Sequence, residues 1–165
     1  MLPRARHRVR QFFGALRPRV STEQRAEAYG YLNDAQRAVF ESMTPRDQQH
    51  GVDVLRRVRS SAAGDDSALF VASLLHDCGK GDVRLWQRVA YVLLAAVAPW
   101  LLKRISLEDG RGWRNALWRL LHHPELGAGI VAATGADPDT VRMIREQDAT
   151  EPDARLALLQ AADEA

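Results

Sequence analysis

The chain has 165 residues, of which 46% are hydrophobic and 27% are charged, and this combination is typical of one globular domain. Its formal net charge of +2 gives no argument for a specific nucleic-acid-binding protein. The single cysteine, Cys78, excludes an internal disulfide and suits a reducing compartment. The first residues lack the apolar stretch of a secretory leader. We therefore expect a cytoplasmic protein.

Basic residues are concentrated at the start of the chain, before the first acidic residue, Glu23. They are Arg4, Arg6, Arg8, Arg10, Arg17 and Arg19. Such a segment can make weak contacts with an anionic surface, and the alternative is a solvated terminus. We assign residues 1–44 to a basic N-terminal segment with lead-in helices and residues 45–165 to the main domain.

Helix start signals are frequent along the chain, and no stretch keeps the period of two that predicts a strand. Thr44 precedes Pro45 and Asp137 precedes Pro138, so each pair places a capping side chain before a proline at the first helical position. Together with short connections, these signals predict an all-α, compact helical bundle. The expected helices cover residues 22–42 with a break near Gly30, 45–59, 66–77, 82–104, 112–122, 124–134, 138–148 and 152–164.

The longest apolar run covers residues 89–102 and contains Pro99. It is shorter than the roughly 20 apolar residues that a membrane-spanning helix needs. We expect a helix buried in the domain, and a helix at a membrane interface is the alternative. The chain has four tryptophans, for which we expect core packing rather than a surface that faces lipid or a partner. They are Trp86, Trp100, Trp113 and Trp118.

Four polar side chains fall at the inner ends of apolar helix faces. His50 lies on the apolar face of its predicted helix, and His76 and Asp77 end the nearly all-apolar helix that follows. Asp163 ends the apolar stripe of the last helix. A lone inward histidine is more often a hydrogen-bonded core residue than a ligand. Because buried charge is costly unless it is paired or bound to a metal, the set as a whole indicates convergence on a cation.

The order of these residues resembles the HD superfamily of metal-dependent phosphohydrolases, whose pattern is H…HD…D, often extended to HDxGK. His50, the sequence HDCGK at 76–80 and Asp163 match that order. The sequence HHPELGA at 122–128 resembles the HPE-G segment of many members, and LQAAD at 159–163 resembles the terminal aspartate segment. The resemblance covers residues 45–165 and implies an all-α HD domain.

The resemblance implies that one divalent metal ion binds these four residues. The ligands are His50, His76, Asp77 and Asp163. Imidazole and carboxylate donors suit Mn, Fe, Zn, Co or Ni, and the lack of thiolate ligands argues against a structural zinc. The metal would activate a water molecule for hydrolysis of a phosphomonoester, a nucleotide or a signalling nucleotide. Asp77, placed beside that water in the family, is expected to accept its proton.

Lys80 and His123 are the expected contacts to a small phosphorylated substrate. Lys80 follows the glycine turn after Asp77, where its ammonium can stabilise charge on a phosphate oxygen, so we expect a catalytic as well as a substrate-binding role. Its alternative role is to interact with the dipole of the preceding helix. His123 lies at a predicted helix start, where it can contact the substrate or donate a proton.

The region after the HPE-G segment departs from the two-metal members of the family, which carry a pair of histidines there. The matching positions hold Gln147 and Asp148, and an amide oxygen is a weak ligand. We therefore expect one tightly bound metal, which disfavours the HD-type oxygenases, although Asp148 can still point inward from the stripe that contains Ile144. The alternative function is a non-catalytic HD module that binds a nucleotide or a protein, with the metal in a structural role.

Overall fold

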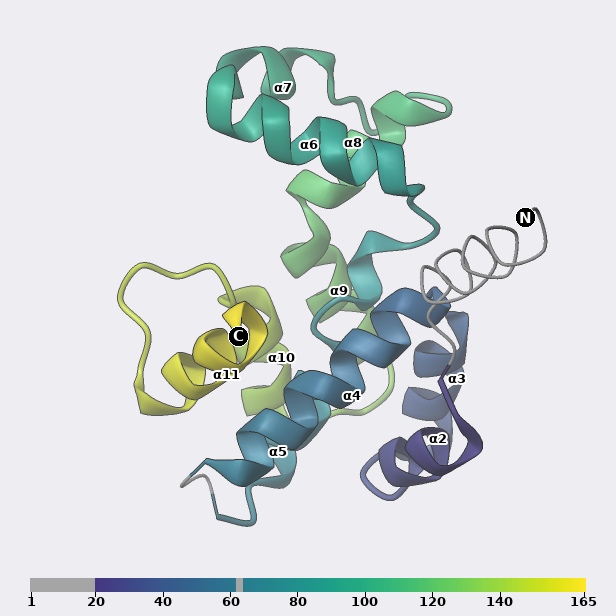
Figure 1. Cartoon of the computed structure of the whole chain (residues 1–165), viewed down its shortest axis with the longest axis vertical. Helices are drawn as coiled ribbons and strands as arrows, with labels where there is room; N and C mark the ends of the chain where they lie inside the picture. The colour runs from purple at the N-terminus through teal and green to yellow at the C-terminus, as the bar shows by residue number, and fades with distance from the viewer. Residues whose placement is uncertain (1–19, 62–63) are drawn as a thin grey trace, which may run out of the picture.

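The computed structural model describes residues 20–61 and 64–165, which form ten α-helices, one short 3-10 helix and no strand (Figure 1). The predicted all-α fold is confirmed, while the basic segment at residues 1–19 lies outside the described residues. The elements are α2 (Thr22–Tyr29), α3 (Asp34–Ser42), α4 (Pro45–Ser60), α5 (Ser67–Leu75), η1 (Cys78–Lys80), α6 (Leu85–Val97), α7 (Pro99–Ile105), α8 (Trp113–Leu121), α9 (His123–Ala132), α10 (Pro138–Arg145) and α11 (Ala154–Glu164).

Side-chain caps determine where several of these helices begin. Thr44 accepts a hydrogen bond from a first-turn backbone N–H of α4 and is followed by Pro45, as expected from the sequence. Asp137 caps α10 in the same way. The last helix begins two residues later than expected, because Asp153 is its cap and accepts a hydrogen bond from the backbone N–H of Leu156.

The two longest predicted helices are each divided in two. The first divides into α2 and α3 after Gly30, as expected. The second, predicted over residues 82–104, divides into α6 and α7 at Ala98, whose φ of −145° and ψ of 63° are not helical. The cause is Pro99, because proline disfavours the helical conformation in the residue before it and has no N–H to continue the hydrogen-bond ladder.

Helix α5 forms the centre of the core, and residues 68–75 are all buried. It packs against α4 on one side and against α10 on another. The backbones of α4 and α5 come so close at Gly51 that a Cβ atom there would lie only 2.7 Å from the carbonyl oxygen of Leu74. This close approach brings His50, the neighbour of Gly51, next to the C-terminal end of α5.

Helix α6 is not buried, which contradicts the prediction for residues 89–102. Its buried residue is the polar Gln87, whereas Val92 and Val97 are 62% and 82% exposed. Hydrophobicity alone predicted burial, but α6 packs mainly on α7 and α8, where few apolar side chains are available to cover it. Within residues 20–61 and 64–165, no helix combines the length and the apolar character needed to cross a membrane.

The tryptophans also differ from the prediction of core packing. Trp86, Trp100 and Trp113 are exposed, and Trp118 is half-buried. Trp86 and Trp100 belong to the same protruding pair of helices as the exposed valines. Their aromatic surface is therefore on the outside of the molecule.

Candidate metal centre

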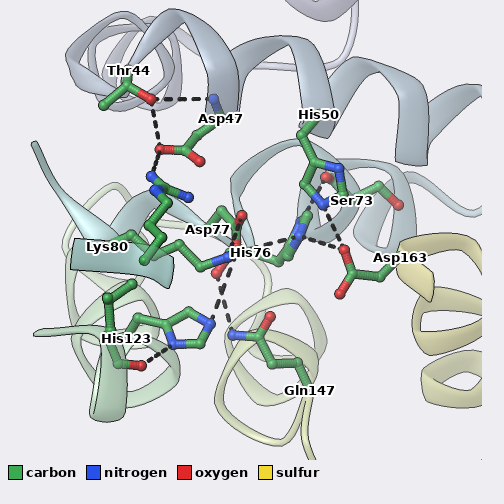
Figure 2. A network of polar contacts seen from close by, with 12 residues as sticks. Thr44, Asp47, His50, Ser73, His76, Asp77, Lys80, His123, Gln147 and Asp163 are labelled. Atoms are coloured by element: carbon green, nitrogen blue, oxygen red, sulfur yellow. Dashed lines mark hydrogen bonds and ion pairs between the residues drawn. The ribbon is translucent and has the colours of Figure 1, made fainter. Parts of the chain in front are cut away.

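The four residues expected to bind a metal come from three parts of the chain, and the structure brings their side chains together (Figure 2). His50 lies on α4, and His76 and Asp77 follow α5 directly. Asp163 lies in the last turn of α11, 113 residues after His50. The packing of α4 and α11 against α5 is what places all four at one end of α5.

The contacts within this group are short. The Nε2 atom of His50 lies 2.6 Å from Oδ1 of Asp163, and Nε2 of His76 lies 3.2 Å from the same oxygen. The Nε2 atom of His76 also lies 3.5 Å from Oδ1 of Asp77. His50, His76 and Asp77 each offer a ligand atom within 4.8 Å of the other two, so these three residues could hold a metal ion. Asp163 is a fourth donor, in contact with both imidazoles.

The surroundings of the buried His76 ring indicate that a cation fits this site. Its Nδ1 lies 3.0 Å from the carbonyl oxygen of Ser73, which can only accept, so Nδ1 carries a hydrogen and, in the neutral ring, Nε2 carries the lone pair. That Nε2 atom is buried and has no hydrogen-bond partner among the described residues. It faces the oxygens of Asp77 and Asp163, which also carry lone pairs, so a proton or a cation is required between them. A histidine held through its other nitrogen by a carbonyl is typical of metal ligands.

The electrostatics keep both carboxylates ionised. Burial disfavours the charged form of Asp77, but the charges of His76 and Lys80 outweigh it and lower the pKa of Asp77 to about 2. Burial is likewise outweighed at Asp163, where contacts with His50 and His76 hold the pKa well below its usual range. Carboxylates must be deprotonated to bind a metal, so these two are ready to do so at neutral pH.

The charge on His76 depends on the same neighbours. Burial lowers its pKa, but the carboxylates of Asp77 and Asp163 outweigh burial and raise the pKa above its usual value. In the absence of a cation, a proton on Nε2 therefore satisfies both oxygens. A proton and a metal ion would compete for the same nitrogen.

Lys80 and His123 lie on the side of the site formed by η1 and α9. The Nζ atom of Lys80 donates to Oδ2 of Asp77 at 2.6 Å, which leaves Oδ1 on the side of His76. The Nδ1 atom of His123 donates to the carbonyl of Leu120 at 2.8 Å, and its Nε2 lies 3.8 Å from Oδ1 of Asp77. Burial, assisted by the charge of Lys80, lowers the pKa of His123, so a neutral ring is expected at neutral pH.

Gln147 and Asp148, at the positions expected for a second metal, lie beside the site. The side-chain amide of Gln147 donates to the backbone carbonyl of His76 at 3.3 Å. The placement of Asp148 on an inward helical stripe is wrong, because α10 ends at Arg145 and Asp148 is an exposed residue beyond it. Both residues line a pocket of about 310 Å³ that Asp163 also borders.

A buried ion pair next to the site was not predicted from the sequence. The Oδ2 atom of Asp47 accepts hydrogen bonds from Arg88 and from the hydroxyl of Thr44, each at 2.7 Å. Asp47 lies one turn before His50 on α4, so the pair joins α6 to α4 next to a candidate ligand. A carboxylate three residues before an inward histidine was the available signal, but its partner is 41 residues away in the chain.

The arrangement offers two imidazoles and two carboxylates, a donor set that suits divalent Mn, Fe, Zn, Co or Ni. An ammonium and a neutral imidazole lie on one side of it. Comparisons with protein-family models, with curated proteins and with solved structures give no match for this chain. The site itself is therefore the basis for inferring a function.

Proposed function

We propose that this protein is a metal-dependent phosphohydrolase of the HD type, acting on a phosphomonoester, a nucleotide or a signalling nucleotide. The observation that carries the proposal is the position of the buried Nε2 atom of His76, which lies 3.2 Å from Oδ1 of Asp163 and 3.5 Å from Oδ1 of Asp77. With His50, these residues follow the H…HD…D order of the HD superfamily.

When bound, a divalent cation would supply a Lewis acid and lower the pKa of a coordinated water from about 15.7 toward 7. The protein would supply proton transfer and substrate contacts. Asp77 is the expected proton acceptor, although a carboxyl group with a pKa of about 2 is a weak base. If Lys80 moves from Asp77 to a phosphate oxygen, one of the charges that lowers this pKa is removed, and Asp77 becomes a stronger base at the moment of reaction.

The charges around the site favour one side for the phosphate group. Lys80 and His123 are on the side of η1 and α9, and both side chains are partly accessible. The pocket lined by Gln147 and Gln160 carries three carboxylates, those of Asp148, Asp163 and Glu164. These carboxylates would repel a phosphate, so we expect the phosphate beside Lys80 and the remainder of the substrate to extend from it.

A metal analysis combined with a hydrolysis screen tests this function. Purified protein loaded separately with each candidate metal would be assayed on phosphomonoesters and on mono-, di- and cyclic nucleotides. Asp77→Ala should lose both the metal and the activity, because it removes a ligand and the proton acceptor. Asp82→Ala is the matched control, since Asp82 is an exposed aspartate nearby. A wild-type protein without bound metal, or hydrolysis that persists in Asp77→Ala, would refute the proposal.

A second candidate is a non-catalytic HD module that binds a nucleotide or a protein, with the metal in a structural role. The contact between Lys80 and Asp77 favours it, because at 2.6 Å the ammonium already has a carboxylate partner. Calorimetric titration of the metal-loaded protein with nucleotides distinguishes the two candidates. Binding without turnover, under conditions where the metal is retained, would favour the module.

A further inference from the structure

Helix α6 buries a polar side chain and exposes apolar ones, which is the reverse of the pattern expected of a helix on the surface of a globular domain. Its buried side chain is Gln87, whose Oε1 accepts a hydrogen bond from the backbone N–H of Arg84 at 2.7 Å. Large apolar side chains cover its exposed surface. They are Leu85, Trp86, Val89, Val92, Leu93 and Val97. Single exposed apolar residues are ordinary, but a contiguous set on one helix indicates a surface that meets another apolar phase.

The α6–α7 hairpin, defined as residues 85–105, carries this surface to one end of the molecule. Figure 1 shows α6 and α7 at the upper end, away from the bundle that contains α4, α5, α10 and α11. The two helices meet at Ala98, and Trp100, in the first turn of α7, is 67% exposed. The tip of the hairpin is therefore apolar and aromatic, and tryptophan is favoured where an apolar phase meets water.

The charges of the hairpin all have the same sign. Residues 83–107, which are the hairpin and two flanking residues on each side, contain no aspartate or glutamate, and their charged residues are Arg84, Arg88, Lys103 and Arg104. Arg88 is paired with Asp47 on α4. Within residues 20–61 and 64–165, the other three form no ion pair, so their charges remain available to an anionic surface.

This charge pattern discriminates between two possible occupants. In a symmetric dimer formed through the hairpin, the basic residues of one copy would approach those of the other, with no carboxylate in residues 83–107 to neutralise them. An anionic bilayer provides both an apolar interior and a layer of negative headgroups. Lys103 and Arg104 lie within two turns of Trp100. This spacing lets their ammonium and guanidinium groups reach lipid phosphates while the tryptophan ring lies in the apolar part of the bilayer.

We propose that the α6–α7 hairpin docks this protein onto the surface of an anionic phospholipid bilayer. The 13 residues of α6 correspond to about 20 Å and the seven of α7 to about 10 Å, so each is shorter than a hydrocarbon core of about 30 Å. The hairpin lies in the interface, with Val97 and Trp100 inserted among the acyl chains. The rest of the molecule, including the candidate metal centre, stays on the aqueous side.

Vesicle flotation tests the docking surface directly. Full-length protein would be mixed with vesicles of phosphatidylcholine, with or without phosphatidylserine, and the vesicle-bound fraction measured over a range of salt concentrations. We expect binding that needs phosphatidylserine and weakens with salt, because exposed charges are screened. A double variant of the tip, Val97→Asp with Trp100→Ser, should reduce the partition coefficient about 100-fold or more, since burial of each large side chain contributes roughly tenfold or more.

Matched controls separate the hairpin from general effects of charge and polarity. Ile130→Asp introduces an acid at an exposed apolar residue of α9, outside the hairpin, and should bind as wild type does. Arg104→Glu should weaken binding about 25-fold, because each basic residue near an anionic surface contributes about fivefold and the substitution changes the charge by two units. Arg145→Glu, an exposed arginine on α10, should leave binding unchanged.

Three results would overturn the docking proposal. They are a wild-type protein that does not float with phosphatidylserine vesicles, a tip variant that floats as well as wild type, and equal binding to vesicles without phosphatidylserine. Light scattering without lipid adds a fourth: a dimer that the tip substitutions abolish, with no vesicle binding, would assign the surface to a second copy. Metal content of each variant, which should equal that of wild type, keeps this test separate from the proposed hydrolase function.

Discussion

His76 combines full burial with a ring nitrogen that has no hydrogen-bond partner among the described residues. In the neutral ring this nitrogen faces only carboxylate oxygens, and an unpaired buried polar atom costs about 1–3 kcal/mol, so a proton or a cation is favoured at that position. The Nδ1 atom is satisfied by the carbonyl of Ser73, so the ring is oriented with Nε2 toward the carboxylates. This orientation is independent of any metal and prepares the site for one.

The raised pKa of His76 predicts how metal binding depends on pH. In the metal-free protein, protonated His76 stabilises the fold below its unfolded-state pKa of about 6.5, and this stabilisation is lost as pH rises through the raised folded-state pKa. Metal binding needs the deprotonated ring, so affinity should increase up to about tenfold per pH unit below that pKa. The increase in melting temperature on adding Mn should therefore grow between about pH 5 and pH 8. Thermal unfolding with Mn or with a chelator measures it, and an increase that is constant with pH would contradict this prediction.

Gly79 is the residue whose substitution should most directly disturb the side of the site that holds His123. A Cβ atom there would lie 2.1 Å from the carbonyl oxygen of His123 and 2.7 Å from the backbone nitrogen of Gly127, so η1 and α9 would have to separate. We expect Gly79→Ala to lower the free energy of unfolding by about 1–3 kcal/mol, measured by urea denaturation.

The control for this substitution lies on α9 itself. A Cβ atom at Gly129 meets no atom within 4 Å, and Gly129 is inside the helix. Gly129→Ala should be neutral or stabilise the protein by about 0.5–1 kcal/mol, because alanine loses less backbone entropy in a helix. Equal destabilisation by both substitutions would show that the contact between η1 and α9 is not the cause.

Helix α11 contributes Asp163 from its last turn, and α4 holds that turn through Arg57 as well as through His50. Arg57 donates a hydrogen bond at 3.0 Å to the carbonyl oxygen of Ala162, the residue before Asp163. Arg57→Met keeps the apolar stem and removes this bond, which contributes about 1 kcal/mol. We expect metal affinity to fall about fivefold, measured by competition with a chromophoric chelator.

Arg56 provides the matched control for this element. It is the neighbour of Arg57 on α4, but its guanidinium bonds to Glu27 on α2 and not to α11. Arg56→Met should affect stability slightly and leave metal affinity unchanged. If the two substitutions weaken metal binding equally, the effect comes from α4 as a whole and not from the tether to α11.

At the level of elements, the sequence predicted helix starts that depend on neighbouring residues, and it missed features that depend on how the helices pack against one another. The start of α4 was predicted from Thr44 and Pro45. The division at Ala98 was missed, because residues 82–104 were predicted as one helix although Pro99 is a local signal for a break. The exposure of α6 could not be predicted, because an apolar helix has the same pattern whether or not neighbours cover it. The pairing of Asp47 with Arg88 depends likewise on how α6 sits on α4.

The four candidate ligands could be chosen from the sequence because each one ends or interrupts an apolar face whose direction is local. Their mutual distances could not, because these depend on the close packing of α4 on α5 at Gly51 and on the position of α11. The end of α10 at Arg145 was equally unpredictable, since no glycine or proline follows directly to mark it. The placement of Asp148 failed for that reason.

For the molecule as a whole, the side chains available as metal ligands predict one tightly bound metal ion. The Nε2 atom of His123 lies 3.8 Å from Oδ1 of Asp77, but Gln147 directs its amide nitrogen to a backbone carbonyl, and amide oxygens are weak ligands. We expect one equivalent of Mn after dialysis of the wild-type protein. The double variant Gln147→His, Asp148→His should approach two equivalents. Two firmly bound equivalents in the wild type would contradict this expectation and reopen the two-metal chemistries.

The separation of His50 and Asp163 by 113 residues has a consequence for how long the protein survives in the cell. An ion bound to both would act as a reversible cross-link. A cross-link that closes a loop of this length lowers the conformational entropy of the unfolded chain, which in the chain-entropy model raises the free energy of the unfolded state by about 4–5 kcal/mol. Without the ion, α11 is held mainly by its packing and by a few hydrogen bonds. Proteolysis begins from such locally opened states, so a bound metal ion would lengthen the lifetime of the protein.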